Sequence, residues 1–439
     1  MAERTAIDID ELREVWWMLS GDDRLEGFRL LDAGAAGEFF VDLDPHDQAE
    51  LLLALRPQER RTWVRLLAPD DAADLIQEVD EEDRGPLLGL LDDAARREVT
   101  VLLAYAEDEA GGLMSSRFAR VRPDMTVDEA ISYLRRQAAA GIELETIYYS
   151  YVLEADQRLI GVVSFRSLFA LPGSQRVRDI MVTDFVAVHE EMDQEQVARL
   201  FAEYDVIALP VVDANGRMKG IVTVDDIVDV VEEEATEDAH KFGGLEALEL
   251  PYLRTGLLSL VRKRAGWLIL LFLGGMLTAT ALGQFQGSIE ALPFLTLFIP
   301  LIIASGGNSG SQASTLVIRA MAMDELRLRD WWRVARREII SGLILGGVLG
   351  AIGFLRIILF PGTIADLGQG IVLLMGLTMT VSLLGVVLFG TLVGSMLPFL
   401  LRRVGLDPAS ASAPLVATLV DVTGLLIYFF AASWMLHQL

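Results

Sequence analysis

The stretch PLVATLVDVTGLLIYFFAASWM, residues 414–435, is an apolar run that is long enough to cross a bilayer. It contains a single carboxylate, Asp421. An ionised acid at this depth costs at least about 2–3 kcal/mol, so such residues generally face a bundle interior or a water-filled path. Asp421 is therefore either a buried aspartate satisfied by neighbouring helices or an ion ligand on a conduction path. The second interpretation predicts a membrane domain that handles cations.

Four further apolar runs precede this one and follow residue 264: residues 265–285, 291–318, 339–360 and 367–401. The last has 35 residues and could form one tilted span or two short ones. Arginines decide between them, because the loops at 319–338 and 402–408 are basic whereas those at 286–290 and 361–366 are not. Five spans, with the N-terminus inside and the C-terminus outside, satisfy the positive-inside rule.

Charge divides the chain into two halves. Residues 1–252 carry 24 Lys and Arg against 55 Asp and Glu, a net charge of −31, whereas residues 265–439 carry nine Arg and eight acids. Such an acidic soluble half excludes nucleic acid as the expected partner and suits metal cations. The chain has no cysteine, which excludes disulfides and thiolate metal sites. Its polar N-terminus predicts that the soluble half stays in the cytoplasm.

The first third of the chain contains a helical repeat. The stretch at 43–51 recurs 24 residues later at 67–75, and a degenerate copy begins at Leu91. Each unit of about 12 residues starts with a proline or an acid and continues with apolar residues at helical spacing. Short helices of this kind bury their apolar faces by stacking, so the pattern predicts an all-α domain and no particular chemistry.

A longer repeat follows, in which Met114, Phe118, Val121 and Met125 recur 67 residues on. Each copy predicts a helix, two strands (residues 147–153 and 158–164, then 208–212 and 218–223) and a second helix. This arrangement resembles a tandem pair of cystathionine-β-synthase (CBS) domains, which usually sense ligands. The nucleotide signature of that family matches Gly220, Thr223 and Asp226, whereas the first copy has Ser167 in place of the acid. The resemblance implies at most one nucleotide, and a purely structural helix cap fits the same residues equally well.

Residues 225–238 contain eight acids in 14 positions. On a helix, Asp226, Asp229, Glu233 or Glu234, and Glu237 fall at spacings of three or four, which places them on one face. A solvated helix face is one interpretation. The other is a sensor for a hard cation, since ligands with only oxygen donors suit Mg²⁺ or Ca²⁺, and no EF-hand spacing is present.

No nucleophile motif, P-loop or dinucleotide fingerprint occurs, so we expect no enzyme. The whole arrangement resembles the MgtE magnesium transporters, most specifically in residues 234–238, in the stretch from Pro300 through 306–312, and in residues 414–421. We therefore expect a multidomain membrane protein. It comprises an all-α N-domain at 1–112, an α/β CBS pair at 113–234, a connecting plug helix at 235–262 and an all-α transmembrane domain at 263–439 with five spans.

The resemblance implies a homodimeric Mg²⁺ channel of the cytoplasmic membrane, closed when cytosolic Mg²⁺ binds the acidic region, with ATP at the CBS pair as a further expectation. It places pore ion-binding residues at Asp421 and Ala417, with Glu338 at the pore mouth and Asp407 as a further candidate. Asn308, in the glycine-rich stretch, either lines the pore as well or bonds a neighbouring helix. It places sensor ligands at Glu195, Asp205, Asp226, Asp229, Glu234, Glu237 and Asp238. A CBS-gated carrier of another divalent cation and a membrane-anchored nucleotide sensor without transport are the alternatives.

Overall fold

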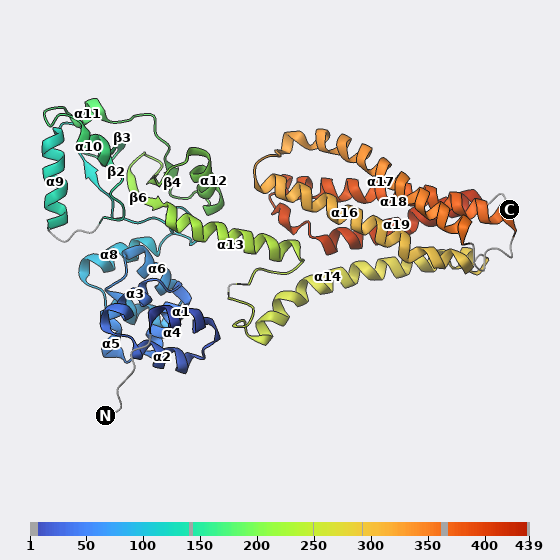
Figure 1. Ribbon diagram of the computed structural model, residues 1–439, viewed down its shortest axis with the longest axis horizontal. Helices are drawn as coiled ribbons and strands as arrows, with labels where there is room; N and C mark the ends of the chain where they lie inside the picture. Colours follow the sequence, from blue (N-terminus) through green and yellow to red (C-terminus); the bar gives the residue numbers. More distant parts are fainter. Residues whose placement is uncertain (1–7, 140–143, 249, 292, 361–367, 437–439) are drawn as a thin grey trace. The chain divides into compact units, whose positions relative to one another are not determined.

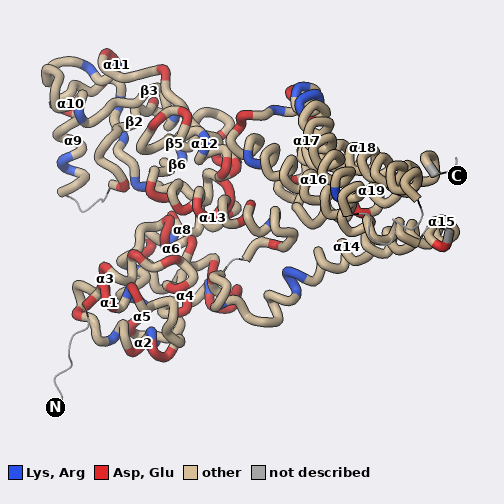
Figure 2. The backbone as a smooth tube through the Cα atoms, turned by 45° about the vertical axis from the view of Figure 1, so that its right-hand side comes forward, with Lys and Arg blue, Asp and Glu red and all other residues tan. Residues whose placement is uncertain are grey.

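The computed structural model describes residues 8–139, 144–248, 250–291, 293–360 and 368–436 (Figure 1). The chain forms two compact units, residues 1–232 and 233–439. Figure 2 shows that acidic residues are numerous throughout the first unit, whereas the long helices of the second are mostly uncharged. The two-part charge distribution of the sequence therefore corresponds to two structural units.

The N-terminal part of the first unit is a stack of short helices, as the repeat predicts. Prolines occupy the first turn of α4, α5 and α6, where the missing N–H costs no hydrogen bond. The side chains of Phe40, Leu52, Leu75 and Ile76 are fully buried in a shared core. The helices are α1 (Ile9–Val15), α2 (Gly21–Leu30), α3 (Ala33–Val41), α4 (Pro45–Ala54), α5 (Pro57–Val64), α6 (Pro69–Gln77), α7 (Glu81–Leu88) and α8 (Asp93–Leu102).

The CBS repeat forms two three-stranded sheets of the same topology, ordered β1-β2-β3 and β4-β5-β6. In each sheet the first pair of strands is parallel and the second antiparallel. The four main strands lie within the predicted ranges. The elements are β1 (Arg120–Val121), α9 (Val127–Ala139), β2 (Tyr149–Leu153), β3 (Leu159–Ser164), α10 (Phe165–Ala170), α11 (Val177–Ile180), β4 (Val188–His189), α12 (Gln194–Tyr204), β5 (Ala208–Val212), β6 (Met218–Thr223) and α13 (Val224–Phe242).

The helical stack is joined to the second CBS repeat by backbone hydrogen bonds and a common core. Ala110 N donates to Met192 O at 2.7 Å, and Gln194 N donates to Asp108 O at 2.8 Å. Leu102 of α8 and Ile227 of α13 belong to the same buried cluster. This packing brings the acidic start of α6 toward the acidic start of α13.

In the described part of the second unit, five helices are long and apolar enough to cross a membrane, as predicted. Helix α18 is unbroken from Gln369 to Arg403, so the described part of the run at 367–401 belongs to one span. Short 3-10 helices flank some spans: η2 (Pro293–Phe298), η3 (Leu328–Asp330) and η5 (Pro408–Ser410). The helices are α14 (Leu257–Gln284), α15 (Gln286–Ala291), α16 (Ile299–Ala322), α17 (Trp331–Leu359), α18 (Gln369–Arg403) and α19 (Ala413–Leu436).

Glycines let α16 and α18 pack with their backbones in direct contact. A Cβ atom at Gly394 would lie 2.0 Å from the carbonyl oxygen of Gly310, and one at Gly390 would lie 2.4 Å from that of Gly306. No side chain fits at these distances, so the two backbones meet through glycine at these points, as small residues commonly allow in membranes. The glycine-rich stretch of the second span is thus held by helix packing.

The connecting segment differs from the helix predicted for residues 235–262. Helix α13 starts earlier, at Val224, and ends at Phe242, and the next helix begins at Leu257. The chain turns at Gly244, whose φ of +74° favours glycine. A Cβ atom there would also lie 2.4 Å from Trp267 Nε1. Both the backbone conformation and the lack of space therefore require glycine at this position.

Candidate functional site

Asp421 and Ala417 lie one turn apart on α19, both half-buried. No hydrogen bond or ion pair links the Asp421 carboxylate to another residue that the structure describes. Ala417 packs on α16, because a Cβ atom at Gly307 would lie 3.5 Å from the Ala417 methyl. The two predicted pore residues therefore share the side of α19 that lies next to α16.

Part of the α16 surface that neighbouring helices leave uncovered is polar, while Leu301 and Leu316 are also exposed on this helix. Ala304, Asn308, Gln312 and Thr315 follow one another at spacings of four, four and three, and all are exposed in the single chain. A residue repeat of this kind lies along one helix face. The opposite side is tied to the chain before α19, where Ser314 Oγ donates to Ala411 O at 2.8 Å. Asn308 thus belongs to an uncovered polar stripe next to the Asp421 helix.

The other two predicted pore residues have different surroundings. Glu338 is half-buried on α17, and its backbone oxygen accepts from Thr391 Oγ1 of α18 at 3.5 Å. Asp407 precedes η5 and accepts a hydrogen bond from Ala409 N at 2.8 Å. Its carboxylate also pairs with Lys241 Nζ at 2.7 Å. Among the residues that the structure describes, no hydrogen bond or ion pair joins either acid to Asp421.

Lys241, near the end of α13, joins two of the predicted ligands. Its ammonium lies 2.5 Å from Glu237 Oε1 and 2.7 Å from Asp407 Oδ2. Burial lowers the pKa of Lys241, but the hydrogen bonds and charges of Asp407 and Glu237 outweigh it and raise the pKa above its usual value. A fixed cation therefore stands between two carboxylates that would otherwise repel one another.

The predicted sensor acids are spread over two helices. Glu195 of α12 pairs with Arg199, and Asp205 caps that helix in a left-handed conformation with φ of +50°. Along α13, Asp229 is exposed, whereas Glu234, Glu237 and Asp238 are half-buried. Burial, followed by the charges of Glu232 and Asp225, raises the pKa of Asp229. The predicted helical placement of the stripe is confirmed, and its role as a ligand set stays a prediction.

Two residues of the nucleotide signature are hydrogen-bonded to each other. Thr223 Oγ1 donates to Asp226 Oδ2 at 2.8 Å. The Asp226 carboxylate is therefore engaged in a hydrogen bond at the start of α13. Gly220 packs closely on the chain, since a Cβ atom there would lie 2.7 Å from Ser115 O. The corresponding residues of the first repeat, Ser164 and Ser167, join hydroxyl to hydroxyl at 2.8 Å. This geometry is that of a helix cap.

The structure adds acids that the sequence interpretation missed. Burial, followed by the charges of Asp70, Asp71, Asp226 and Glu107, raises the pKa of Asp74 to about 8. Burial, followed by the charge of Asp70, raises the pKa of Asp71 to about 6. Burial above all, aided by the charges of Asp225 and Asp70, raises the pKa of Asp226 to about 7. Acids of α6 and α13 thus share one partly buried region.

Asp70 is the most enclosed acid of this group, with 9% of its surface exposed. Its Oδ1 atom is buried and accepts no hydrogen bond. Burial outweighs its hydrogen bonds and the nearby Arg117 and raises the pKa of Asp70. Burial also raises the pKa of Glu145, and the charges of Asp70 and Asp71 raise this pKa further. Within the described residues, however, no three acidic or histidine side chains converge on a single point where they could hold a metal ion.

The 24-residue repeat held a signal for this cluster. In the first copy, Asp47 and Glu50 both pair with the buried Arg24, at 3.0 and 2.9 Å. Their equivalents in the second copy are Asp71 and Asp74. The position equivalent to Arg24 is occupied by Gln48, so the second copy lacks the arginine. An acid pair without the arginine that its equivalent has in the other copy is a signal for a cation site, although the charge of Arg117 acts on Asp71.

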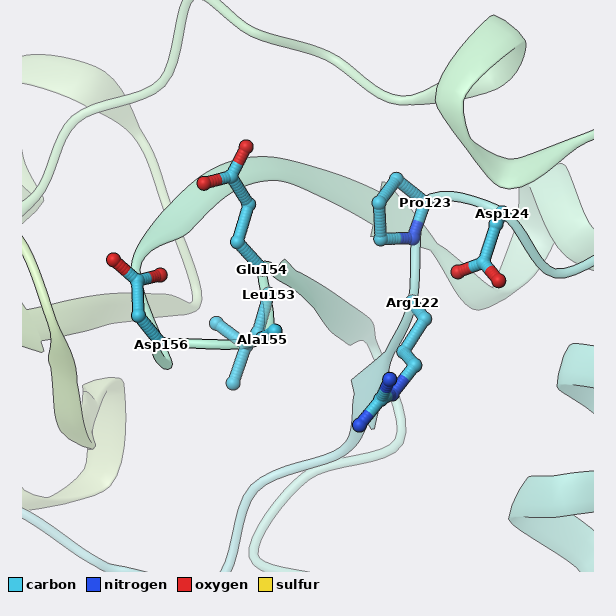
Figure 3. A pocket seen from close by; sticks show the side chains of 7 residues that line it. All are labelled: Arg122, Pro123, Asp124, Leu153, Glu154, Ala155 and Asp156. Carbon is cyan, nitrogen blue, oxygen red and sulfur yellow. The ribbon is translucent and has the colours of Figure 1, made fainter.

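A separate hollow of about 370 Å³ lies in the first CBS repeat (Figure 3). The close-up shows two chain segments on its sides, one after β1 and one in the turn between β2 and β3. Its lining residues are Arg122, Pro123, Asp124, Leu153, Glu154, Ala155 and Asp156. None of the predicted nucleotide or metal residues lines it.

The fold and these residues define a multi-pass membrane protein with an acidic CBS-containing unit. The family profile described as a divalent cation transporter, MgtE, matches residues 299–431; the MgtE intracellular N domain matches 7–108, and CBS domains match 110–172 and 177–233. The magnesium transporter MgtE of Thermus thermophilus is 45% identical over 430 residues, covering 97% of this chain and 93% of the relative. The chain therefore belongs to the MgtE family.

The chain is also similar to two further proteins. The magnesium transporter MgtE of Bacillus subtilis is 33% identical over 352 residues, which cover 80% of this chain and 75% of the relative. A crystal structure of the cytosolic domain of the Mg²⁺ channel MgtE in complex with ATP is 44% identical and covers 52% of this chain and 92% of that one, with a TM-score of 0.47. The expected architecture of N-domain, CBS pair and membrane helices is that of the family.

Proposed function

We propose that this chain forms a Mg²⁺ channel whose ion path includes Asp421. The observation that carries the proposal is the position of this carboxylate on α19, with no described partner, beside the uncovered polar stripe of α16. Amides and hydroxyls facing lipid would cost free energy, so a water-filled path or a second copy of the chain must cover this stripe. Membership of the MgtE family supports Mg²⁺ as the ion.

A homodimer satisfies these requirements in the simplest way. On a two-fold axis the same helix face meets its own copy, so two Asp421 carboxylates would approach each other. Two such groups repel unless a cation lies between them. Mg²⁺ gives up its water reluctantly, so a pair of carboxylates and the Ala417 carbonyls suit an ion bound through its hydration shell. Such binding is weak enough to let the ion leave again.

For regulation, we propose that cytosolic Mg²⁺ binds the acids at the start of α6 and those of α13 and closes the channel. The raised pKa values of Asp74 and Asp226 support this, because burial and then the charges of neighbouring acids disfavour the ionised carboxylates, which a bound cation would stabilise. The side chains do not converge on one point, so Mg²⁺ would act through bound water or after small side-chain movements. The alternating charge of the loops supports an outside C-terminus.

Lys241 supplies a test of the connection between α13 and the loop before α19. Replacing Lys241 with glutamine should release Asp407 and raise the Mg²⁺ concentration that inhibits flux. The pair is partly exposed, so the expected effect is about 1 kcal/mol, or about fivefold in the inhibition constant. Flux into liposomes against internal Mg²⁺ measures it. Replacing Lys219, which forms a longer ion pair with Glu190, is the matched control; an inhibition curve that does not move would remove Lys241 from the gating mechanism.

The acids of α6 and α13 predict a pH dependence. The folded-state pKa values of Asp71, Asp74 and Asp226 exceed that of an unfolded aspartate. Between about pH 4 and pH 8 the folded state therefore binds more protons, and the free energy of unfolding falls as the pH rises. Without Mg²⁺, trypsin should cut the first unit of the full chain faster at about pH 8.5 than at about pH 6.

Controls make this pH test specific. Mg²⁺ should restore protection at the higher pH, and KCl of equal ionic strength should not. Asp74→Asn should reduce the difference between the two pH values, whereas Asp22→Asn, at an exposed acid outside the cluster, should preserve it. The intrinsic pH dependence of trypsin is removed by normalising to an unfolded substrate. Equal protection at both pH values would contradict the acid-cluster account.

We also propose that the CBS pair takes one adenine nucleotide, ATP, through Gly220, Thr223 and Asp226. A related cytosolic domain is described as a complex with ATP. In this chain the ribose would have to displace the bond between Thr223 and Asp226. Calorimetric titration of the full chain with ATP tests this, and binding that survives Thr223→Val would assign the residues to the helix cap alone.

Two alternatives remain distinguishable from the main proposal. Uptake assays with Mn²⁺, Co²⁺ and Ca²⁺ in place of Mg²⁺ distinguish a carrier of another divalent cation from the proposed Mg²⁺ channel. A nucleotide sensor without transport would show ATP binding and no Mg²⁺ flux in liposomes. Mg²⁺-dependent flux through the purified chain is the measurement that decides between all three.

A further inference from the structure

The segment that leads into α17 carries exposed cationic and aromatic side chains. Arg329, Arg333, Arg336 and Arg337 are all exposed, and 85% of the Arg333 side chain is accessible. Trp331 and Trp332 lie between them, 52% and 60% exposed, with ring centroids 5.6 Å apart. Figure 2 shows the resulting basic cluster at this end of α17.

Acidic neighbours neutralise only part of this cluster. Arg327 pairs with Asp324 at 2.7 Å, and Arg333 pairs with Asp330 at 3.2 Å. By contrast, Arg329, Arg336 and Arg337 form no ion pair within the described part of the chain. Three guanidinium groups thus retain their full capacity for bidentate hydrogen bonds to an anion with phosphate geometry.

The chemistry of this helix face changes along its axis. The exposed residues after Arg336 are Ile340 and Ile344, each one turn further on. Arg336 and Ile344 are therefore separated by about 12 Å along α17. Along α17 the indoles of Trp331 and Trp332 and then the guanidinium of Arg336 precede these branched alkyl side chains. This change from cationic and aromatic to aliphatic groups matches a phospholipid from its headgroup to its acyl chains. The buried residues Val334 and Ala335 lie on the opposite side, against the bundle.

We propose that Arg329, Arg336 and Arg337, with Trp331 and Trp332, form a binding surface for the headgroups of anionic phospholipids. Because the soluble N-domain is cytosolic and two spans precede α17, this surface belongs to the cytoplasmic leaflet. A cationic residue close to an anionic membrane surface strengthens binding by about fivefold. Indole rings prefer the same interfacial depth. The surface anchors an otherwise strongly acidic protein at a membrane that carries the same sign of charge.

Tryptophan quenching in the reconstituted full chain tests this proposal. The protein is placed in phosphatidylcholine bilayers that contain a minor fraction of brominated phosphatidylglycerol, and separately of brominated phosphatidylcholine. A Trp331→Phe, Trp332→Phe variant gives the fluorescence of the other tryptophans, which is subtracted as background. We expect stronger quenching by the brominated anionic lipid, and a loss of that preference by about fivefold for each arginine replaced in Arg329→Gln, Arg336→Gln, Arg337→Gln.

Arg356 provides the matched control, since it is exposed at the other end of α17 and donates to Phe360 O at 2.7 Å. Arg356→Gln should leave the lipid preference unchanged. If the triple variant does not fold, the single change Arg336→Gln with a fivefold loss carries the same test.

Three outcomes would overturn the proposal. The first is equal quenching by both brominated lipids, or a preference that the arginine changes do not alter. The second is relief of quenching by inorganic phosphate at constant ionic strength, which would indicate a site for free anions. The third is a change of oligomeric state in the triple variant, which would assign the surface to contact between copies of the chain.

Discussion

Replacing Asp421 with alanine is expected to reduce Mg²⁺ flux into liposomes by at least about tenfold, equivalent to about 1.4 kcal/mol or more in ion binding. The change removes the carboxylate of α19 from each subunit, and with it the charge that draws a hydrated divalent cation into a low-dielectric path. Folding should be preserved, because the Asp421 side chain makes no hydrogen bond or ion pair with any residue in the described ranges. The assembly state of the variant, measured by light scattering, should match that of the wild type.

Two further variants sharpen this test. Asp421→Asn keeps the size and removes the charge, and should lose flux as the alanine variant does. Thr423→Val lies two residues away, where the Thr423 hydroxyl only donates to Leu419 O at 2.7 Å within its own helix, and should retain flux. Wild-type flux through folded Asp421→Ala protein would exclude Asp421 from the ion path.

Replacing Asp226, Asp229, Glu234 and Glu237 by their amides is expected to give a channel that conducts at Mg²⁺ concentrations that close the wild type. The amides keep size and helix compatibility, but they are much poorer ligands for Mg²⁺ than carboxylates. A near-complete switch needs about 5.5 kcal/mol of differential affinity between states, and removing four ligands should eliminate much of it. Open probability measured against cytosolic Mg²⁺ reports the change.

This experiment also separates ligand loss from simple electrostatics. If the acids acted only by repelling one another, neutralising them would favour the closed state even without Mg²⁺. A control with the same change of charge uses exposed acids outside α13, at Asp10, Asp22, Glu81 and Glu82, and should keep the wild-type inhibition curve. A quadruple α13 variant that is closed without Mg²⁺, or one that is inhibited normally, would contradict the sensor assignment.

The sequence predicted the membrane domain well because its signals are local. A span needs only an unbroken apolar run of sufficient length, and the arginines of the loops supplied the number of spans. The strands of the CBS pair were equally accessible, since the two copies repeat the same apolar pattern. The connecting segment was predicted less well. Its helix ends at Phe242 because Gly244 turns the chain beside Trp267, a contact across more than 20 residues.

The residues of the candidate site likewise include some that the sequence reveals and others that only the fold reveals. Asp421 was identifiable from sequence alone, because a lone acid in an apolar run is costly wherever the helix packs. Asp70, Asp71 and Asp74 were not, because acids at the start of a short helix usually interact with its N-terminus. Their burial depends on how α6 packs near α13, some 150 residues later in the chain. The pairing of Lys241 with Asp407 likewise required the fold.

By itself, then, the sequence determined that this protein has an acidic soluble part, a CBS pair and five spans with a carboxylate in the last. These properties follow from composition and periodicity, which each segment carries regardless of its neighbours. Only the tertiary structure decided which acids lose their solvent, which face of α16 stays uncovered and which arginines stay free of acidic partners. Those properties depend on distances between residues far apart in the chain, and packing alone sets such distances.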